Sequence, residues 1–364
     1  MTLQFKYNKD DKTKKLLKNI LITSSYCETL GFKNGEWEFN FNAETNDMSD
    51  FLYFTHLIID NYMFLGGPNI DISSFNASDD TILTLAVVDG VINNNYRKGF
   101  NNYRNLIFQD KRASGINTIT ILDFIKNNPD KKIPYTDNAG GNGAAIRTAP
   151  IGILFSNIND IISHSFINSI ETHNQVLGFM GGIATAVITF FAKEKIKPTK
   201  WFDELIKLDK NKVIEDILDK MNYENKDKYI KNKFTFWDKI KDYNEFRKTK
   251  ILKKKYEKIH DRFNYLLRLL RPNYKNSKFV HLGASGLEII ILSFEAILLS
   301  YDEKIDTIDF NKLVFYGILH FGDNDSTGSV VGAWYSAYHN IVPPNIKPLQ
   351  LEFIKDINSL VDKL

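Results

Sequence analysis

The chain has 364 residues, of which 43% are hydrophobic and 25% are charged, and this composition is typical of a soluble globular protein. Its formal net charge of +3 is too small for so long a chain to indicate a nucleic-acid partner. Its single cysteine, Cys27, excludes an internal disulfide framework and favours a reducing compartment, so we expect a cytoplasmic protein.

The N-terminal part of the chain predicts a helix followed by a turn. Residues 1–12 carry several charges and lack the continuous apolar core of a signal peptide. Residues 14–31 place apolar side chains at helical spacing, and Gly31 is a plausible stop. Beyond the turn at Asn34-Gly35, Glu38 stands between two aromatic residues. It is either a functional carboxylate in an apolar setting or a surface residue on a short extended segment, and the sequence alone favours the second.

Two acidic clusters, far apart in the chain, share one design. Residues 78–81 (Ser-Asp-Asp-Thr) and residues 323–326 (Asp-Asn-Asp-Ser) each precede a run that is typical of a helix, so each taken alone is a candidate helix cap. An EF-hand is excluded, because its twelfth position would fall on Trp334 where a bidentate Glu is required. Oxygen ligands at this density suit a hard divalent cation, and four carboxylates nearly balance two such ions. Together, the clusters predict a shared metal site.

Between the clusters lie two segments that suit a phosphate-containing ligand. Residues 111–115 form a basic turn that either contacts a phosphate or is a solvated loop. Residues 138–147 contain three glycines, which would let backbone amides approach a ligand closely; the alternative is a glycine-rich connection between buried helices. Because Ile146 occupies the third glycine position of a Rossmann fingerprint and no Lys-Ser or Lys-Thr follows, neither a Rossmann site nor a nucleoside triphosphatase is expected.

The remaining segments predict further helices. Residues 151–191 are heavily apolar, but no window, including 178–191, approaches the roughly 20 apolar residues of a membrane span. His173 lies at a polar entry to this region, where a lone histidine is more often a capping or packing residue than a catalyst. Residues 200–275 read as amphipathic helices, and the small-residue turn 283–286 precedes another apolar helix. Because strand-like alternation is slight and the acidic clusters lie toward opposite ends, we expect an all-α fold in a single domain spanning the whole chain.

In their order along nearly the whole chain, these segments resemble the ADP-ribosylglycohydrolase family, most closely its ADP-ribosylarginine hydrolase branch. Residues 37–39 (Trp-Glu-Phe) are what points to the arginine branch. Two positions depart from the family pattern, because Glu28 follows Cys27 where relatives show Gly-Asp, and Glu288 stands where an Asp usually follows the turn. The segments that carry the resemblance are 34–39, 78–81, Arg112 with Gly115, 140–147, Thr172-His173 with Gly178, 283–286 and 322–327.

The resemblance implies an orthogonal helical bundle with a binuclear metal cleft that holds two Mg²⁺ ions, with Mn²⁺ as a possible substitute. Glu38 would lie on a mobile entrance loop near the scissile bond, and Asp79 or Asp80 would assist proton transfer from a water activated between the ions. The metal ligands implied are Ser78, Asp79, Asp80, Asp323, Asp325 and Ser326. The residues implied for ADP-ribose binding are Arg112, Gly115, Gly141, Asn142, Gly143, His173, Gly283, Ser285 and Gly286.

The activity implied is hydrolysis of the N-glycosidic bond between ADP-ribose and protein arginine, which reverses mono-ADP-ribosylation. One alternative is hydrolysis of ADP-ribosylserine or O-acetyl-ADP-ribose with the same metals. Another is a catalytically silent ADP-ribose binding module, although the retention of every expected ligand argues against it. The expected partners are an ADP-ribosylated protein and ADP-ribose, with no nucleic acid and no membrane, and we expect a monomer.

Overall fold

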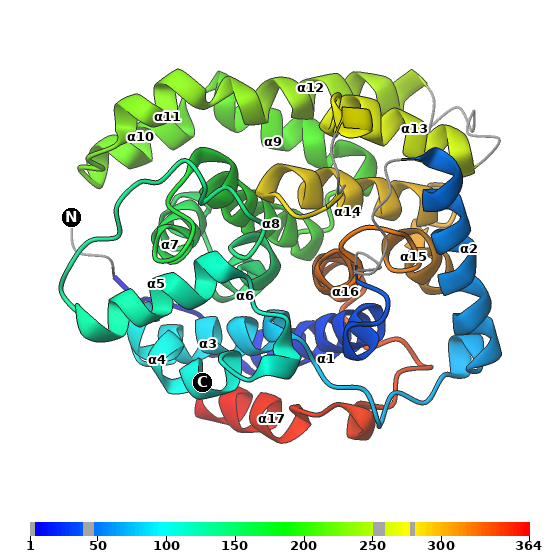
Figure 1. Ribbon diagram of the computed structural model, residues 1–364. Coiled ribbons are helices and arrows are strands. Elements are labelled where there is room, and N and C mark those ends of the chain that lie inside the picture. The colour runs from blue at the N-terminus through cyan, green and yellow to red at the C-terminus, as the bar shows by residue number, and fades with distance from the viewer. Residues whose placement is uncertain (1–3, 39–46, 250–258, 277–280) are drawn as a thin grey trace.

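The computed structural model describes residues 4–38, 47–249, 259–276 and 281–364, and helices account for most of the regular structure within these ranges (Figure 1). Their two short strands, β1 (Tyr301–Asp302) and β2 (Thr307–Ile308), form an antiparallel hairpin. The predicted all-α fold is therefore confirmed. The α-helices are α1 (Asp11–Phe32), α2 (Met48–Phe64), α3 (Asp79–Ile92), α4 (Tyr96–Ile107), α5 (Ile116–Asn127), α6 (Ala149–Leu154), α7 (Ile158–Ile170), α8 (Val176–Lys193), α9 (Trp201–Lys210), α10 (Val213–Lys220), α11 (Lys226–Asn232), α12 (Phe234–Thr249), α13 (Ile259–Leu270), α14 (Gly286–Ser300), α15 (Phe310–Gly317), α16 (Asn324–His339) and α17 (Ile354–Lys363). The 3-10 helices are η1 (Lys33–Gly35), η2 (Gly67–Asn69), η3 (Asp110–Arg112), η4 (Ala145–Arg147), η5 (Pro198–Lys200), η6 (Tyr274–Asn276) and η7 (Pro348–Gln350).

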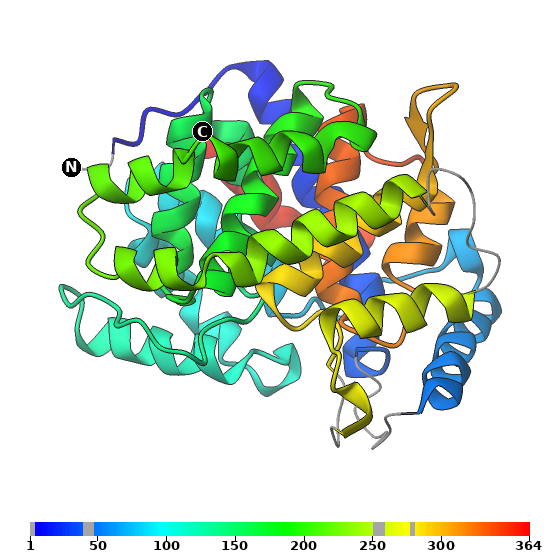
Figure 2. The same ribbon diagram turned by 90° about the horizontal axis from the view of Figure 1, so that it is seen from above.

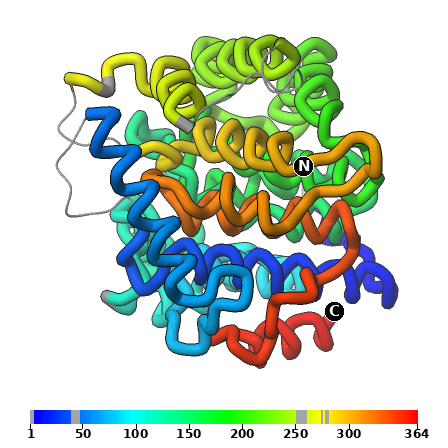
Figure 3. The backbone as a smooth tube through the Cα atoms, turned by 90° about the vertical axis from the view of Figure 1, so that its right-hand side faces the viewer, coloured from blue at the N-terminus to red at the C-terminus, as the bar shows by residue number. Residues whose placement is uncertain are grey.

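Helices α1 and α16 form the central pair of the molecule, although they come from opposite ends of the chain. Figure 3 shows α14, α16 and α1 stacked in successive layers, with α17 beyond α1. The two central helices approach so closely that a Cβ atom at Gly328 would lie 2.5 Å from the carbonyl oxygen of Cys27, and one at Gly31 would lie 2.5 Å from that of Asn324. The missing side chains therefore allow the backbones to touch. This contact brings the start of α16 against the end of α1.

Gly31 was predicted as a helix stop, but α1 continues past it to Phe32. The helix ends instead at Lys33, whose left-handed backbone (φ 40°) forms the C-cap. The glycine is needed for the close approach of α16 rather than for termination. The other end of α1 begins at a cap, because the Asp10 carboxylate accepts a 2.8 Å hydrogen bond from the Thr13 amide.

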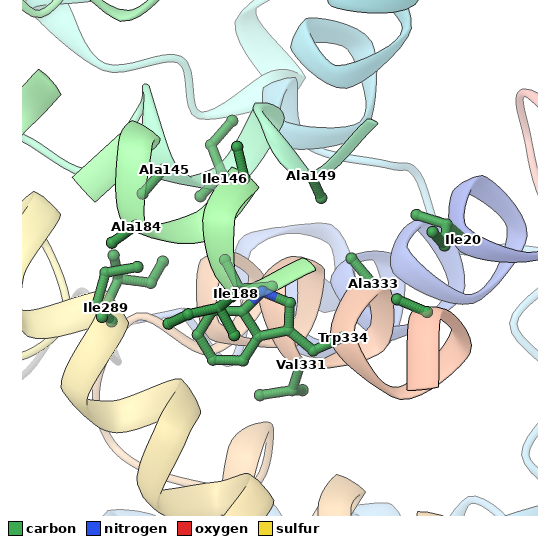
Figure 4. Packing of buried hydrophobic residues seen from close by; sticks show 14 of the residues in the cluster. Ile20, Ala145, Ile146, Ala149, Ala184, Ile188, Ile289, Val331, Ala333 and Trp334 are labelled. Carbon is green, nitrogen blue, oxygen red and sulfur yellow. The ribbon is translucent and has the colours of Figure 1, made fainter. Parts of the chain in front are cut away.

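The apolar core lies between α8, α14 and α16. Figure 4 shows the indole of Trp334 against Ile188 and Val331, and all three side chains are fully buried. The indole N–H donates a 3.3 Å hydrogen bond to the Thr185 carbonyl, which satisfies its polar atom within the core. These contacts fix α16 against α8. The buried apolar cluster runs from α1 to α17. The single domain expected from the sequence stays a prediction.

By length and composition alone, α8 could cross a membrane, which the sequence analysis did not anticipate for this stretch. However, 83% of the helix is buried inside the protein. Its small residues explain the burial, because a Cβ atom at Gly181 would lie 2.6 Å from the Gly286 carbonyl oxygen at the start of α14. The helix is thus packed as a core helix.

The region predicted as amphipathic helices forms α9 to α13, which cover one side of the core at the top of Figure 1. Seen from above in Figure 2, α12 lies across the molecule, and it contacts α8, α9 and α14. Several ion pairs join residues of this layer. The Lys233 ammonium, for example, lies 2.6 Å from Glu215 and 3.0 Å from Asp209.

Candidate functional site

The first acidic cluster lies at the start of α3. Ser78 is its N-cap, and the Ser78 hydroxyl accepts a 3.2 Å hydrogen bond from the Asp80 amide. Asp79 and Asp80 occupy the first turn, and both are buried, with 8% and 6% of their surfaces exposed. Solvated capping residues would not need such burial. Ser78 does cap the helix, but the carboxylates of Asp79 and Asp80 are buried as well.

The second cluster lies at the start of α16, where Asp323 occupies the cap position but makes no side-chain capping bond. One of its carboxylate oxygens accepts a 2.8 Å hydrogen bond from the Asn142 side chain instead. Asp325 is buried in the first turn, and its carboxylate accepts from the Ser326 amide at 2.8 Å. The helix-cap interpretation therefore does not account for Asp323.

The two clusters and Glu38 converge in one buried place. One carboxylate oxygen from each of Glu38, Asp323 and Asp325 lies within 4.8 Å of the others. Burial raises the pKa of Asp80, and the neighbouring charges of Asp325 and Asp79 raise it further. Burial and Asp325 likewise raise the pKa of Asp79 to about 8. Carboxylates from α3 and α16 thus repel one another across a shared space.

Several of these carboxylate oxygens have no hydrogen-bond donor. Among the described residues, the buried oxygens without a partner include Glu38 Oε2, Asp80 Oδ2 and Asp323 Oδ1. Buried polar atoms are rarely left unpaired in proteins, and an unpaired carboxylate oxygen is costly. A divalent cation would satisfy the aspartate oxygens and cancel the repulsion, and an all-oxygen donor set suits Mg²⁺, Mn²⁺ or Ca²⁺. The residues present therefore fit a metal site, while the number of ions stays a prediction.

Glu28 supports the start of α3 from α1. One of its carboxylate oxygens accepts a hydrogen bond from the Ser78 amide, and the other accepts from the hydroxyls of Thr81 at 2.7 Å and Thr29 at 3.0 Å. Burial raises its pKa to about 7, although the bonds from Ser78 and Thr81 oppose this shift. In the sequence, Glu28 stands out only as a departure from a family pattern. The contacts show that the residue joins α1 to the acidic cluster.

The glycine loop 140–143 and the turn 283–286 pair with each other. Gly141 and Ser285 form an isolated antiparallel bridge, and the Gly286 amide donates to the Gly140 carbonyl at 3.1 Å. Asn142 joins this pair to the second acidic cluster, because its side-chain amide also donates to the Gly283 carbonyl at 3.0 Å. Two segments that the sequence predicts as ligand-binding thus lie together beside Asp323.

Gly283 and Gly143 are required where they stand. Gly283 has a left-handed backbone (φ 103°), and a Cβ atom there would lie 2.7 Å from the Asp323 side chain. A Cβ atom at Gly143 would lie 2.6 Å from the imidazole of His173. Burial lowers the pKa of His173 to about 3, and the charge of Arg147 adds to this effect, so the ring is neutral against the glycine loop.

Arg112 and Gly115 lie outside the two acidic clusters. The Arg112 side chain is 2% exposed, and its guanidinium donates to Glu352, to the Ala77 carbonyl and to the Gln109 side chain. Gly115 is the N-cap of α5, and a Cβ atom there would meet nothing within 4 Å. Neither residue contacts the acidic clusters directly, and their roles in ADP-ribose binding stay predictions. Phe39, which closes the aromatic patch, lies outside the described residues.

A cavity of about 220 Å³ lies between α7 and the connection from α10 to α11. It is lined by Phe166, Tyr223 and other residues, with an ion pair between Arg97 and Glu171 at 2.6 Å in its wall. None of the site carboxylates lines it. The chemistry of the acidic clusters therefore does not take place in this cavity.

Comparisons with known proteins agree with the geometry. The family model described as ADP-ribosylglycohydrolase matches residues 30–364. A protein of Acanthamoeba polyphaga mimivirus that carries the name of an ADP-ribosyl glycohydrolase is 28% identical over 94% of this chain and 68% of its own length. The ADP-ribosylhydrolase ARH1 of Dictyostelium discoideum is 25% identical over 90% of this chain and 87% of its own length.

Two further similarities concern a vertebrate relative and a solved structure. The ADP-ribosylhydrolase ARH3 of Xenopus tropicalis is 24% identical over 79% of this chain and 80% of its own length. A solved structure titled as an ADP-ribosylglycohydrolase-related protein complex superposes with a TM-score of 0.54 at 13% identity, covering 97% of this chain and 98% of that one, and this similarity concerns the fold. Given the match over nearly the whole chain and the paired acidic clusters at two helix starts, the chain belongs to the ADP-ribosylglycohydrolase family.

Proposed function

We propose that this protein is a magnesium-dependent hydrolase that cleaves the N-glycosidic bond between ADP-ribose and protein arginine, with Mn²⁺ as a possible substitute. The observation that carries the proposal is the buried convergence of Glu38, Asp323 and Asp325, in which Glu38 Oε2 and Asp323 Oδ1 have no hydrogen-bond donor. Such a donor set favours metal-assisted hydrolysis over simple binding. The same proposal includes an ADP-ribosylated protein as substrate, a monomeric state and a cytoplasmic location.

The residues that would hold the metal come from the starts of α3 and α16. When bound, divalent ions orient sugar hydroxyls and lower the pKa of a bound water. Asp79 or Asp80 would assist proton transfer in this proposal, which their burial beside the other site carboxylates supports. The proposed ligands are Ser78, Asp79, Asp80, Asp323, Asp325 and Ser326.

The reaction is a hydrolysis at the anomeric carbon of the ribose. The water oxygen forms a new bond to this carbon while the bond to the arginine nitrogen breaks, and the water proton ends on the leaving guanidine. The sugar passes through an oxocarbenium-like state, which nearby carboxylates stabilise. The paired segments around Gly141 and Ser285 offer backbone amides and small residues for the diphosphate and the ribose.

Glu38 is the residue that favours arginine as the modified side chain. Its carboxylate is buried, and burial together with the nearby charge of Asp325 raises its pKa. A guanidinium matches a carboxylate with two parallel hydrogen bonds, so an incoming arginine would supply the missing donor to Glu38 Oε2. A serine hydroxyl or an acetyl ester lacks this fork of donors.

The experiment that tests the proposal measures release of ADP-ribose from matched peptides. One peptide carries ADP-ribosyl-arginine and the other ADP-ribosyl-serine, and each is incubated with and without Mg²⁺. We expect magnesium-dependent release from the arginine peptide. Faster release from the serine peptide would favour the serine and O-acetyl alternative, and tight ADP-ribose binding without release from either peptide would leave only a binding module.

A further inference from the structure

We propose that Arg112 and Glu352 are positioning residues that hold the start of α3 in the geometry needed for metal binding. This inference rests on the proposed metal site, and it adds the C-terminal segment to the parts of the chain that build that site. We call the two residues the Arg112–Glu352 clamp. The clamp acts on the segment 74–78, which leads into the first acidic cluster.

The clamp is a bidentate ion pair between residues 240 positions apart in the chain. The two terminal nitrogens of Arg112 each donate to a different oxygen of Glu352, and both distances are 2.8 Å. The Arg112 side chain is 2% exposed and that of Glu352 is 29% exposed. The guanidinium also lies 5.3 Å from the centre of the Phe353 ring. A bidentate, largely buried pair has a defined geometry, unlike most surface ion pairs.

Both members of the clamp also hold the backbone of Ala77. Arg112 donates to the Ala77 carbonyl at 2.7 Å, and Glu352 accepts from the Ala77 amide at 3.1 Å. Ala77 immediately precedes Ser78, the N-cap of α3 and a proposed metal ligand. Hydrogen bonds to both backbone groups of one residue fix its peptide planes, so the clamp sets the direction in which the chain enters α3.

The segment is held from other sides as well. The Asn34 side-chain oxygen accepts from the Asn76 amide at 2.7 Å, and Lys111 donates to the Asn76 side chain at 3.0 Å. Asn34 belongs to the turn that leads toward Glu38, and its left-handed backbone (φ 59°) places it there. The clamp therefore supports a segment that is hydrogen-bonded to the turn before Glu38 and that leads into the first acidic cluster.

Loss of one clamp member leaves the other poorly satisfied. Burial alone would raise the pKa of Glu352, but hydrogen bonds from Arg112 and from the Ala77 amide hold this pKa below its ordinary value. The carboxylate is therefore ionised when it accepts the hydrogen bond from Ala77. A lysine at position 112 would keep the charge but could not bind Glu352 and Ala77 with a planar fork. Removal of groups that orient metal ligands weakens metal binding by about 10- to 100-fold in other proteins.

The test compares metal binding and local opening in Glu352→Gln and Arg112→Lys with the wild type. Mn²⁺ is the probe, and its free concentration is followed by electron paramagnetic resonance without substrate. We expect each variant to bind Mn²⁺ about 10-fold more weakly or worse. Amide hydrogen exchange of residues 74–81 should also become faster, while exchange in α9 to α12 stays unchanged. Circular dichroism checks that both variants keep their helices.

The matched control is Glu215→Gln, which removes the buried carboxylate of a residue in α10 from its 2.6 Å ion pair with Lys233. It should leave Mn²⁺ binding and exchange of residues 74–81 unchanged. If Glu352→Gln and Arg112→Lys kept the wild-type Mn²⁺ affinity and the wild-type exchange rates of residues 74–81, the clamp would be overturned. It would also be overturned if the control lost as much Mn²⁺ affinity as these two variants. A wild-type protein that binds no Mn²⁺ would contradict the proposed function instead, and the exchange result alone would then decide whether the clamp positions α3.

Discussion

Carboxylates that repel one another are buried together at the starts of α3 and α16, and this burial has a free-energy cost in the absence of a cation. Asp80 shows the effect most clearly, because burial and the charges of Asp325, Asp79 and Asp323 all raise its pKa. This free-energy cost arises in the metal-free protein. A divalent cation would remove it by supplying the missing positive charge.

The stability of the metal-free protein should depend on pH, because buried carboxyl groups hold protons in the folded state. The raised pKa values of Asp79 and Glu28, about 8 and about 7, lie above the value near 4 of an unfolded carboxyl group. Between these limits the folded protein keeps protons that the unfolded chain releases. The contribution to the free energy of unfolding is therefore fully present near pH 4 and is lost as pH rises toward 8. We expect the unfolding midpoint of the metal-free protein to fall over this range and Mg²⁺ to restore it.

Asp80→Asn tests whether the clustered carboxylates, and not other titrating groups, cause this pH dependence. Removing one negative charge should raise the unfolding midpoint of the metal-free protein at pH 8 by about 2 °C or more, which roughly 1 kcal/mol produces in a large domain. It should also reduce the stabilisation by Mg²⁺. Thermal melts at pH 5 and pH 8, with chelator and with Mg²⁺, provide the measurement. Identical pH dependence in the variant and the wild type would show that the clustered carboxylates are not the cause.

The sequence predicted the residues of the two acidic clusters but not the residues that support them. Ser78, Asp80 and Asp325 stand in short motifs whose residue types already indicate a cation. Glu28 and Glu352 stand in no such motif, and their partners lie 50 and 240 positions away. Contacts at such separations depend on the packing of α1 and of the C-terminal segment, which local spacing does not encode.

At the scale of elements, the crossing of α1 and α16 decides where the second acidic cluster lies. Gly31, Gly328 and Gly332 remove the side chains that would separate the two helices. The hydroxyl of Ser24 donates to the Ser329 carbonyl at 2.8 Å within the same contact. The first turn of α16 is thereby brought toward the end of α1, from which Glu28 supports α3.

Gly328→Ala tests this crossing. A Cβ atom there would lie 2.5 Å from a carbonyl oxygen of α1, so the helices must move apart, and overpacking of this kind costs about 1–3 kcal/mol. We expect lower stability in chemical denaturation and weaker Mn²⁺ binding, because Asp325 lies in the adjacent turn. Lys18→Ala on the exposed side of α1 is the control and should change neither. Unchanged stability of Gly328→Ala would mean that the helix contact adapts without strain.

Helical periodicity predicted many elements but not their division. The region from 14 to 31 corresponds to α1, and the apolar pattern after residue 81 corresponds to α3. The continuous apolar pattern from 151 to 191 is instead divided into α6, α7 and α8. The breaks fall at Asn157 and Gln175, the N-caps of α7 and α8, and single capping residues are weak signals inside a long apolar pattern.

At the scale of the whole molecule, the site is assembled from segments that span nearly the entire chain. Glu28 and Glu38 come from the N-terminal part, the glycine loop around Asn142 from the middle, and Asp323 and Glu352 from the C-terminal part. The family match over residues 30–364 agrees with this distribution. A truncation at either end would therefore remove a site contact as well as core packing.

The central claim is that the two acidic clusters form one metal site that performs the hydrolysis. The most direct measurement titrates metal-free protein with Mn²⁺ and records release of ADP-ribose from an ADP-ribosyl-arginine peptide against ions bound per chain. We expect release to rise and to saturate at two ions in the wild type. Asp325→Ala should lower it at least about 100-fold with helical content intact, since the variant loses a metal ligand and with it the metal assistance to hydrolysis. Full release by the metal-free protein, or wild-type release by Asp325→Ala, would contradict the account.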